Sequence, residues 1–253
     1  MRAARSWHQR DGPRYHPGPI DPKVNAPAVD DRPPTSPPKP VTPRDAASLV
    51  IHREFRGHHE VLMGRRGSRA RFKPGVYVFP GGGLERADYR VQPLGDLHHE
   101  IPSQMAVGHS LRKANALALA AVREAFEEAG LLFGDAGDVG SVAHNTWQEF
   151  RRRQVAPNLG ELQFLGRAIT PSYQPIRFHA RFFSIPFERL NGELGGDGEL
   201  EDLRWIGLDE IHGLEMMIVQ EMIMATLKRR LAGLDAPAQR LFFGWGKRNV
   251  VDA

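Results

Sequence analysis

The amino-acid sequence predicts an α+β domain, an α/β/α sandwich in which helices cover both faces of a mixed β-sheet. Short β-rich apolar runs occur soon after residue 45 and return between residues 162 and 206, with helical patterns between and after them. These strands and helices alternate without the regular spacing of βαβ units. We therefore expect a mixed sheet rather than a purely parallel one.

The composition is that of a soluble globular protein. The chain has 253 residues, of which 41% are hydrophobic and 25% charged, which favours one domain with extensions. The absence of cysteine excludes disulfides, thiolate catalysis and Cys-ligated zinc, and is compatible with a cytoplasmic location. The longest apolar stretch, 114–122, is far shorter than the roughly 20 residues that span a bilayer, so we expect no membrane segment. The N-terminal arginines precede no hydrophobic run, so we expect no secretory signal.

Residues 1–44 differ in composition from the rest of the chain. They hold eight Lys/Arg and four Asp/Glu residues, which accounts for the formal net charge of +4, and 11 of the 20 prolines. We interpret them as a disordered, proline-rich basic tail ahead of a domain formed by residues 45–253. A ligand for an SH3-like domain or a nucleic-acid arm is the alternative. No regular interleaving of basic and aromatic residues supports nucleic-acid binding, so we expect none.

The first elements of the domain are strands. Residues 47–53 (ASLVIHR) and 59–66 (HEVLMGRR) read as a pair of strands joined by a short connection, and 75–80 (GVYVFP) reads as a third. The third leads into three glycines, 81–83, which we expect to form a tight turn. A loop rich in His, Pro and Gly follows, in which His98 and His99 are expected to be exposed.

A long helix follows this loop. We expect it to run from about Ser110, as N-cap, to Ala129, with Gly130 as its C-terminal stop. Its buried stripe is predicted to consist of Leu119, Val122, Phe126 and Ala129. The later elements expected are a helix near 146–154, strands near 162–169, 177–185 and 202–206, and a final helix near 215–231.

Three glutamates gather near the end of the long helix. Glu124 lies three and four residues before Glu127 and Glu128, so the three side chains share a face, and Arg123 can pair with Glu127 along the helix. Crowding like charges costs on the order of 1 kcal/mol per pair in water and about 4 kcal/mol in a partly buried setting. A cation should offset this cost, and hard oxygen ligands suit Mg²⁺ or Mn²⁺. Taken alone, the cluster is more typical of a solvated face.

The surrounding sequence changes that interpretation. The segments FPGGGLERAD (79–88) and AAVREAFEEAGLL (120–132) together resemble the signature of the Nudix hydrolase family, in which a glycine, five residues, a glutamate and seven residues precede R-E-U-x-E-E-x-G-U. The positions that match are Gly82, Arg123, Glu124, Glu127, Glu128, Gly130 and Leu131. Asp88 stands where the family has the first glutamate, and Ala125 where a larger aliphatic residue is usual. Between Asp88 and Arg123 lie 34 residues where the pattern has seven, an insertion centred on about 89–109.

The interruption resembles one branch of that family. The insertion and the segment ITPSYQPIRFHARFFSI (169–185) are similar to the coenzyme A diphosphatases called Nudix-type motif 19 and their bacterial relatives. The matching positions are Thr170, Pro171, Arg177, Phe178, Phe182 and Phe183, while His179 and Ala180 depart from the pattern. For Phe182 and Phe183 we expect packing within a strand rather than ligand stacking.

The resemblance implies roles for particular residues. It implies metal ligation by Glu124, Glu127 and Glu128, with Arg123 orienting Glu127, and a phosphate or metal site completed by Gly81 and Gly82. The catalytic base would be a glutamate of the motif, Glu127 or Glu128, or an acid of the loop before Trp205 and Glu210, where Glu199 and Asp202 are candidates. Basic side chains suited to phosphate are Arg65, Arg66, Arg69, Arg71, Lys73 and Arg177. Solvated loop residues are the alternative for the acids and for the basic group.

Three functions stay open from the sequence. The first is a Mg²⁺- or Mn²⁺-dependent hydrolase that cleaves coenzyme A or acyl-coenzyme A to 3′,5′-ADP and a 4′-phosphopantetheine product. The second is the same chemistry on ADP-ribose, NADH or a nucleotide. The third is a catalytically silent Nudix module that senses a nucleotide or binds a partner. By analogy with the family, a homodimer is also expected.

Overall fold

The structure is a computed structural model that describes residues 41–253 except 69, 71, 211–212 and 245–246. The predicted tail, 1–44, therefore falls almost wholly outside the described residues, as do the candidate phosphate-binding residues Arg69 and Arg71. The first strand begins at Arg44, within one residue of the predicted start of the domain.

The predicted mixed sheet is confirmed. In the described part of the chain its strands follow the order β11-β2-β1-β9-β8-β12-β13, with β3 beside β2 and β4 beside β1. Strand β1 runs parallel to β9 and β8 parallel to β12, while the other pairings are antiparallel. The strands are β1 (Arg44–Phe55), β2 (His58–Arg66), β3 (Tyr77–Val78), β4 (Gly81–Gly83), β8 (Gln163–Ile169), β9 (Phe178–Pro186), β11 (Leu200–Gly207), β12 (Gln239–Gly244) and β13 (Lys247–Asp252).

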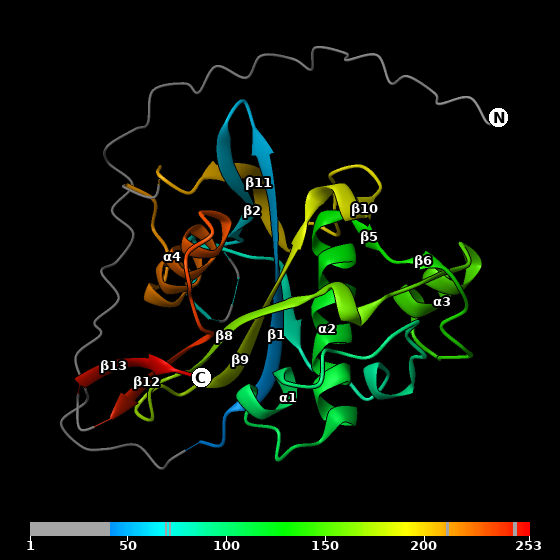
Figure 1. The fold of residues 1–253 in the computed structure, drawn as a ribbon, viewed down its shortest axis with the longest axis horizontal. Helices are drawn as coiled ribbons and strands as arrows, with labels where there is room; N and C mark the ends of the chain where they lie inside the picture. Colours follow the sequence, from blue (N-terminus) through cyan, green and yellow to red (C-terminus); the bar gives the residue numbers. More distant parts are fainter. Residues whose placement is uncertain (1–40, 69, 71, 211–212, 245–246) are drawn as a thin grey trace. The chain divides into compact units, whose positions relative to one another are not determined.

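Helices cover both faces of this sheet. Figure 1 shows α2 (Leu111–Ala129) and α4 (Ile218–Leu231) on opposite sides of the central strands. Leu49 and Ile51 of β1 pack into the core beneath α2, whereas Val50 packs into the core beneath α4. Because successive side chains of a strand point to opposite faces, an unbroken apolar run marks a strand buried on both sides.

Smaller elements complete the domain. Two pairs of short strands stand outside the main sheet: β5 (Leu132–Phe133) with β10 (Leu190–Asn191), and β6 (Asp135–Ala136) with β7 (Val155–Ala156). The remaining elements are α1 (Ile101–Gln104), α3 (Asn145–Arg152) and the 3₁₀ turns η1 (Asp88–Arg90), η2 (Leu159–Glu161) and η3 (Phe187–Arg189). None of the helices in the described ranges is both long and apolar enough to cross a membrane.

The boundaries of α2 agree with the prediction. The Ser110 side chain accepts a hydrogen bond from the Lys113 N–H, and Gly130 closes the helix in the left-handed conformation with φ of 73°. Leu119, Val122 and Ala129 are buried as expected, and Phe126 is partly buried. The opposite side of the helix is not a solvated face, because Arg123 and Glu128 are buried as well.

The expected glycine turn is wrong. Gly81–Gly83 form strand β4, paired antiparallel with β1. A Cβ on Gly81 would lie 2.2 Å from the Ser48 Oγ, and one on Gly82 would lie 2.3 Å from the Glu124 Oε1. Glycine is needed here because backbone and carboxylate approach closely, and a turn is not formed.

Residues 89–109 are more ordered than the predicted loop. They contain α1, and Asp88 begins η1 immediately before them. Five of their side chains join the core beneath α2, namely Val91, Leu97, Ile101, Met105 and Val107. His98 and His99 are exposed, as expected. Strands β12 and β13 were not expected, and the last helix begins at Ile218, three residues later than predicted.

Candidate active site

The glycine strand and the acidic helix meet at Gly81. Its backbone N–H donates to the Glu128 Oε2 at 2.8 Å, and the missing side chain of Gly82 leaves room for the Glu124 carboxylate. Two segments that are more than 40 residues apart in the sequence thus form one site. Gly81 and Gly82, which the resemblance implied would complete a metal or phosphate site, lie against the glutamates of α2.

Arg123 is the buried centre of a hydrogen-bond network. Its guanidinium donates to the Asp88 Oδ1 at 3.0 Å through Nε and to the Gly83 carbonyl at 2.7 Å through Nη2. The side chain is 1% exposed and that of Asp88 is fully buried. Asp88 also accepts from the Trp147 Nε1 at 3.1 Å and from the Glu85 N–H at 2.9 Å. Asp88, which stands in the sequence where the motif has a glutamate, therefore joins Arg123 to α3 and to the segment before η1.

Glu127 is held from two sides. The Arg123 Nη1 donates to its Oε2 at 3.1 Å, which confirms the pairing expected along the helix. Its other oxygen, Oε1, accepts from the Thr146 hydroxyl of α3. Because both of its oxygens accept hydrogen bonds from side chains, Glu127 is fixed in orientation. Glu128 differs, since it accepts from the Gly81 backbone.

Glu124 and Glu128 lack that compensation. Burial raises the pKa of Glu124 to about 7, even though Arg123 donates to its Oε1 at 2.8 Å. Burial raises the pKa of Glu128 to about 9, and the Gly81 N–H only partly offsets this. The nearby negative charge of Glu199 adds to both shifts. Arg123 offsets part of this effect at Glu124 and Arg66 part of it at Glu128, but burial outweighs both, so the charged forms of the two carboxylates need a further cation to stabilise them.

Glu199 is carried to the site by a glycine-rich loop. The Gly195 N–H donates to the Ala129 carbonyl at 3.1 Å and the Asp197 N–H to the Glu127 carbonyl at 2.9 Å, which caps the end of α2. A Cβ on Gly196 would lie 2.2 Å from the Glu128 carbonyl oxygen, so the loop depends on its glycine there. The loop and the helix end thus position Glu199 near the two buried glutamates.

Asp202 lies differently from Glu199. It sits at an irregularity in the pairing of β11 with β2, with φ of 51°, and its carboxylate accepts from the Tyr77 hydroxyl and from Arg204. Burial acts to raise the pKa of Asp202, but the hydrogen bonds from Arg204 and Tyr77 outweigh it and hold the pKa below its ordinary value. Asp202 is therefore bonded to side chains of β3 and β11 and not to the glutamates of α2.

Of the predicted basic residues, Arg66 lies at the site, whereas Arg65 and Arg177 have partners elsewhere. The Arg66 Nη2 lies 3.9 Å from the Glu199 Oε1, and its charge acts on Glu128, so Arg66 belongs to the site. Arg65 forms an exposed ion pair with Glu201 at 3.1 Å. Arg177 instead donates to the carbonyls of Thr170 and Val41.

Register explains why Arg177 lies apart. Its neighbour Phe178 pairs with Arg44, whereas Gly81 pairs with Ser48, four residues further along β1. At about 3.3 Å per residue this is roughly 13 Å along the strand. Phe182 and Phe183 are buried in the two cores, so their predicted role in packing is confirmed.

Two residues of the site were not foreseen. Thr146 and Trp147 of α3 hold Glu127 and Asp88, and both are buried. A tryptophan next to a threonine at the start of a short helix was the available signal. It could not be assigned because both residues lie outside the two motif segments and reach Glu127 and Asp88 only in the folded chain.

The donor set fits a hydrated divalent cation. Among the described residues, no three carboxylate or histidine side chains converge closely enough to enclose a metal ion by themselves. Mg²⁺ characteristically uses one or two carboxylates, keeps several waters and takes further oxygens from substrate phosphates. Glu128, which is buried, and Glu124, which is partly buried, both have raised pKa values and match that requirement.

Comparisons with known proteins agree with this geometry. A family model described as the NUDIX domain matches residues 42–226. A NUDIX hydrolase from Alicyclobacillus acidocaldarius is similar in structure, with a TM-score of 0.57 and 25% sequence identity over 77% of this chain and 98% of that chain. A Caenorhabditis elegans protein named as a nudix hydrolase 7 is 28% identical over 152 residues, 55% of this chain. The chain spans 43% of the length of that curated relative.

Proposed function

This chain belongs to the Nudix family, and from that premise we propose that it is a metal-dependent pyrophosphohydrolase acting on a nucleoside diphosphate linked to another group. The observation that supports the metal dependence is the state of Glu124 and Glu128. Glu128 is buried and Glu124 partly buried, burial raises the pKa of both, and a divalent cation would stabilise their charged forms.

The metal would be held by Glu124 and Glu128. When bound, a divalent cation neutralises phosphoryl oxygens and lowers the pKa of a coordinated water. Glu127 was also expected to be a ligand; its two oxygens are engaged by Thr146 and Arg123, which favours a role in shaping the site. Arg123 acts as a positioning residue, since it joins Glu124 and Glu127 to the buried Asp88.

Glu199 is the base that we favour for the attacking water. Its side chain is 59% exposed and its charge is felt by both buried glutamates, so it borders the site and faces solvent. Asp202, the other candidate, is occupied by Tyr77 and Arg204. Arg66, opposite Glu199, is placed to meet a phosphate oxygen.

For the substrate we propose coenzyme A or acyl-coenzyme A, cleaved to 3′,5′-ADP and a 4′-phosphopantetheine product. The resemblance of residues 169–185 to the coenzyme A diphosphatase branch supports this choice. ADP-ribose, NADH and nucleotides are the alternatives, since the same site would act on any pyrophosphate of this class. The homodimer and the cytoplasmic location expected from the sequence stay predictions.

Product analysis tests the proposal. The protein is incubated with Mg²⁺ or Mn²⁺ and an equimolar mixture of coenzyme A, acetyl-coenzyme A, ADP-ribose and NADH, and the products are identified by mass spectrometry. Release of 3′,5′-ADP by the wild type but not by Glu128→Gln is expected. AMP from ADP-ribose or NADH would keep the chemistry and change the substrate, and no cleavage of any pyrophosphate would contradict the proposed function.

A further inference from the structure

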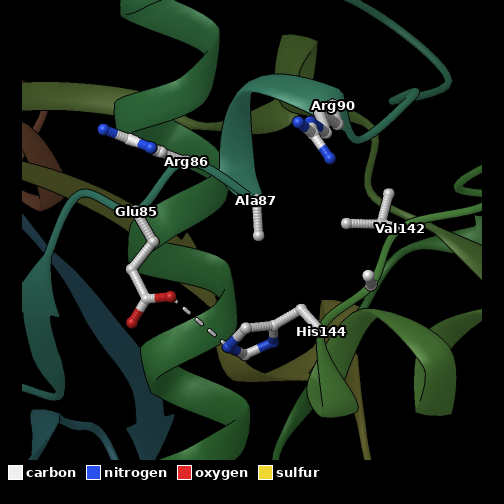
Figure 2. A pocket seen from close by; sticks show the side chains of 7 residues that line it. Glu85, Arg86, Ala87, Arg90, Val142 and His144 are labelled. Atoms are coloured by element: carbon white, nitrogen blue, oxygen red, sulfur yellow. Dashed lines mark ion pairs between the residues drawn. The ribbon is translucent and has the colours of Figure 1, made fainter.

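Two exposed carboxylates, Glu85 and Glu199, lie beside the candidate active site. Figure 2 shows the Glu85 carboxylate turned toward the His144 ring, and its Oε2 lies 3.6 Å from the His144 Nε2. Its Oε1 lies 4.0 Å from the Arg123 Nη1, so Glu85 stands between two side chains that can pair with it. The Glu199 Oε1 lies 3.9 Å from the Arg66 Nη2, beyond hydrogen-bond distance. The position of Glu199 therefore depends on the backbone that carries it.

The backbone that follows Glu199 contains a β-bulge. Between Glu201 and Arg204 the pairing of β11 with β2 shifts by one residue, so two residues of β11 lie opposite one of β2. That one is Gly64, where a Cβ would lie 2.7 Å from the Leu200 Cβ, so glycine leaves room for the bulged strand. Without the extra residue, the chain before the bulge would shift by about 3.3 Å and Glu199 would face the other side of the sheet. The bulge therefore determines where Glu199 stands.

Asp202 is the bulged residue with an unusual backbone conformation. Its φ of 51° lies in the left-handed region, which is uncommon for residues other than glycine and persists where the surrounding contacts fix it. Its carboxylate accepts from the Tyr77 hydroxyl and from the Arg204 Nη2, and Arg204 also donates to the Tyr77 hydroxyl. The Arg204 Cζ lies 5.0 Å from the centre of the Tyr77 ring. These three side chains hold the bulge, and Tyr77 is the buried one among them.

Tyr77 joins the bulge to the segment that reaches Glu128. It belongs to β3, and four residues later the Gly81 N–H donates to the Glu128 Oε2 at 2.8 Å. The Tyr77 N–H donates to the Glu215 carbonyl at 2.8 Å, which fixes its backbone. Burial raises the pKa of Tyr77 to about 12, so the hydroxyl keeps its proton and donates it to Asp202.

We propose that Tyr77 is a positioning residue for Glu199. Its hydroxyl fixes the bulge at Asp202, and the bulge holds Glu199 at its place beside Glu124 and Glu128. The inference rests on the proposed function, in which Glu199 is the base for the attacking water. Tyr77 acts through Glu199, so the contribution of its hydroxyl to the rate exists only while the Glu199 carboxylate is present.

The first variant removes the hydroxyl alone. Tyr77→Phe keeps the ring that packs in the core beneath α4, so the protein should fold. We expect kcat for the pyrophosphate that the wild type cleaves to fall about 10- to 100-fold, because a small displacement of a catalytic group has effects of this size. KM should change less than about twofold, because substrate binding does not use Tyr77. Tyr173→Phe removes a hydroxyl from the turn between β8 and β9 and is the matched control, which should change neither quantity.

A double variant tests whether Tyr77 acts through Glu199. Glu199→Gln should lower kcat strongly, and adding Tyr77→Phe to it should lower kcat less than about twofold further, because the group that Tyr77 positions is already gone. If the two losses multiply, Tyr77 acts independently of Glu199, and the inference is overturned.

Asp202 provides a rescue experiment. Asp202→Ala removes the acceptor of the Tyr77 hydroxyl and should reproduce the loss in kcat with KM unchanged. Asp202→Asn keeps an oxygen that accepts from Tyr77, and asparagine tolerates the left-handed backbone, so it should recover most of the rate that Asp202→Ala loses. An equal loss in both variants would mean that the charge of Asp202 matters and not the fixed bulge, which would overturn the inference.

Hydrogen exchange of the peptide 197–204 tests the position of the segment without any substrate. The backbone amides there should exchange faster in Tyr77→Phe than in the wild type and in Tyr173→Phe, and unchanged exchange would overturn the inference. If Glu199→Gln keeps the wild-type kcat, Glu199 is not the base, and the inference falls with that assignment while the hydrolase stands. If the protein cleaves no pyrophosphate, the proposed function fails, and hydrogen exchange still decides whether Tyr77 holds the segment.

Discussion

Two buried carboxylates, Asp88 and Glu128, lie within the same small region and have opposite surroundings. Asp88 is fully buried and accepts hydrogen bonds from the guanidinium of Arg123, the indole of Trp147 and the backbone of Glu85. Glu128 is 2% exposed and accepts one backbone N–H, from Gly81, and burial raises its pKa to about 9.

This difference in hydrogen-bond partners distinguishes a structural carboxylate from one that binds a ligand. A carboxylate whose partners are all supplied by the protein belongs to the scaffold. One that is buried without them must be completed by something that binds. Arg123 accounts for the difference between the two environments. Its guanidinium donates to Asp88, to the Gly83 carbonyl, and to Glu124 and Glu127. Glu128 instead accepts from the backbone N–H of Gly81.

We expect the largest effect on activity from changing Glu128, the carboxylate whose partners are incomplete. Glu128→Gln removes a proposed metal ligand, whose contribution of several kcal/mol to the transition state corresponds to a loss in kcat of about 10³-fold. The amide oxygen can still accept from the Gly81 N–H, and a poorly compensated buried acid is removed. The protein without metal should therefore unfold at the same or a higher temperature than the wild type.

Steady-state kinetics and thermal unfolding in EDTA measure both quantities. Glu201→Gln, which removes an exposed carboxylate paired with Arg65, is the matched control and should change neither. A strong decrease in thermal stability of Glu128→Gln would contradict the distinction, because Glu128 would then be part of the scaffold.

Changing Asp88, whose partners are all supplied by the protein, should have the reverse effect and lower stability. Asp88→Ala leaves the buried guanidinium of Arg123 and the indole of Trp147 without their acceptor, so we expect a loss of about 3–5 kcal/mol in the free energy of unfolding. Chemical denaturation measures it, and any activity that remains should come from the folded fraction.

Asp88→Glu is the informative companion to this variant. It restores the residue of the family motif and keeps the charge, but adds a methylene to a site with no exposure. Overpacking predicts a smaller loss of about 1–3 kcal/mol. If Asp88→Glu were more stable than the wild type, the tight fit around Asp88 would be wrong.

Metal binding should act on Glu124 and Glu128 and leave Asp88 unaffected. A ligand that binds only the folded state stabilises it by about 2.7 kcal/mol at 100 times its dissociation constant. Addition of Mg²⁺ should therefore raise the unfolding temperature of the wild type by several degrees and that of Glu124→Gln/Glu128→Gln little. Differential scanning calorimetry in Mg²⁺ and in EDTA checks this without any substrate. An equal shift in both proteins would mean that the ion binds elsewhere.

Much of the fold could be predicted because its elements have local signals. Ser110 and Gly130 mark the ends of α2, and the apolar run 49–51 marks a strand buried on both faces. Strands β12 and β13 lack such a signal: β12 owes its place to pairing with β8, and β13 to pairing with β12. The glycines 81–83 misled the prediction because a requirement for close approach and a requirement for turning select the same residue.

The candidate site was predictable where helix periodicity brings residues together, as for Arg123 with Glu127. It was not predictable where contacts join segments that are distant in the sequence. Thr146 and Trp147 reach Glu127 and Asp88 only after the chain has folded back, and nothing in their local sequence specifies that distance. Arg177 shows the converse: it matches the family segment, but strand register places its neighbour Phe178 opposite Arg44, four residues along β1 from the partner of Gly81.

Thr146 offers the finest test of the comparison, because it lies on the boundary between the two environments. Its hydroxyl donates to Glu127, while its neighbour Trp147 supports Asp88. Thr146→Val keeps the volume of a side chain that is 7% exposed and removes only the donor. Loss of a hydrogen bond that orients a residue of a metal site typically costs about 10-fold or more in activity. We expect that decrease in kcat with little change in KM, and Thr146→Ser should restore the rate because it restores the hydroxyl. If Thr146→Val keeps the wild-type kcat, Arg123 alone suffices to position Glu127, and α3 contributes to the site only by holding Asp88 through Trp147.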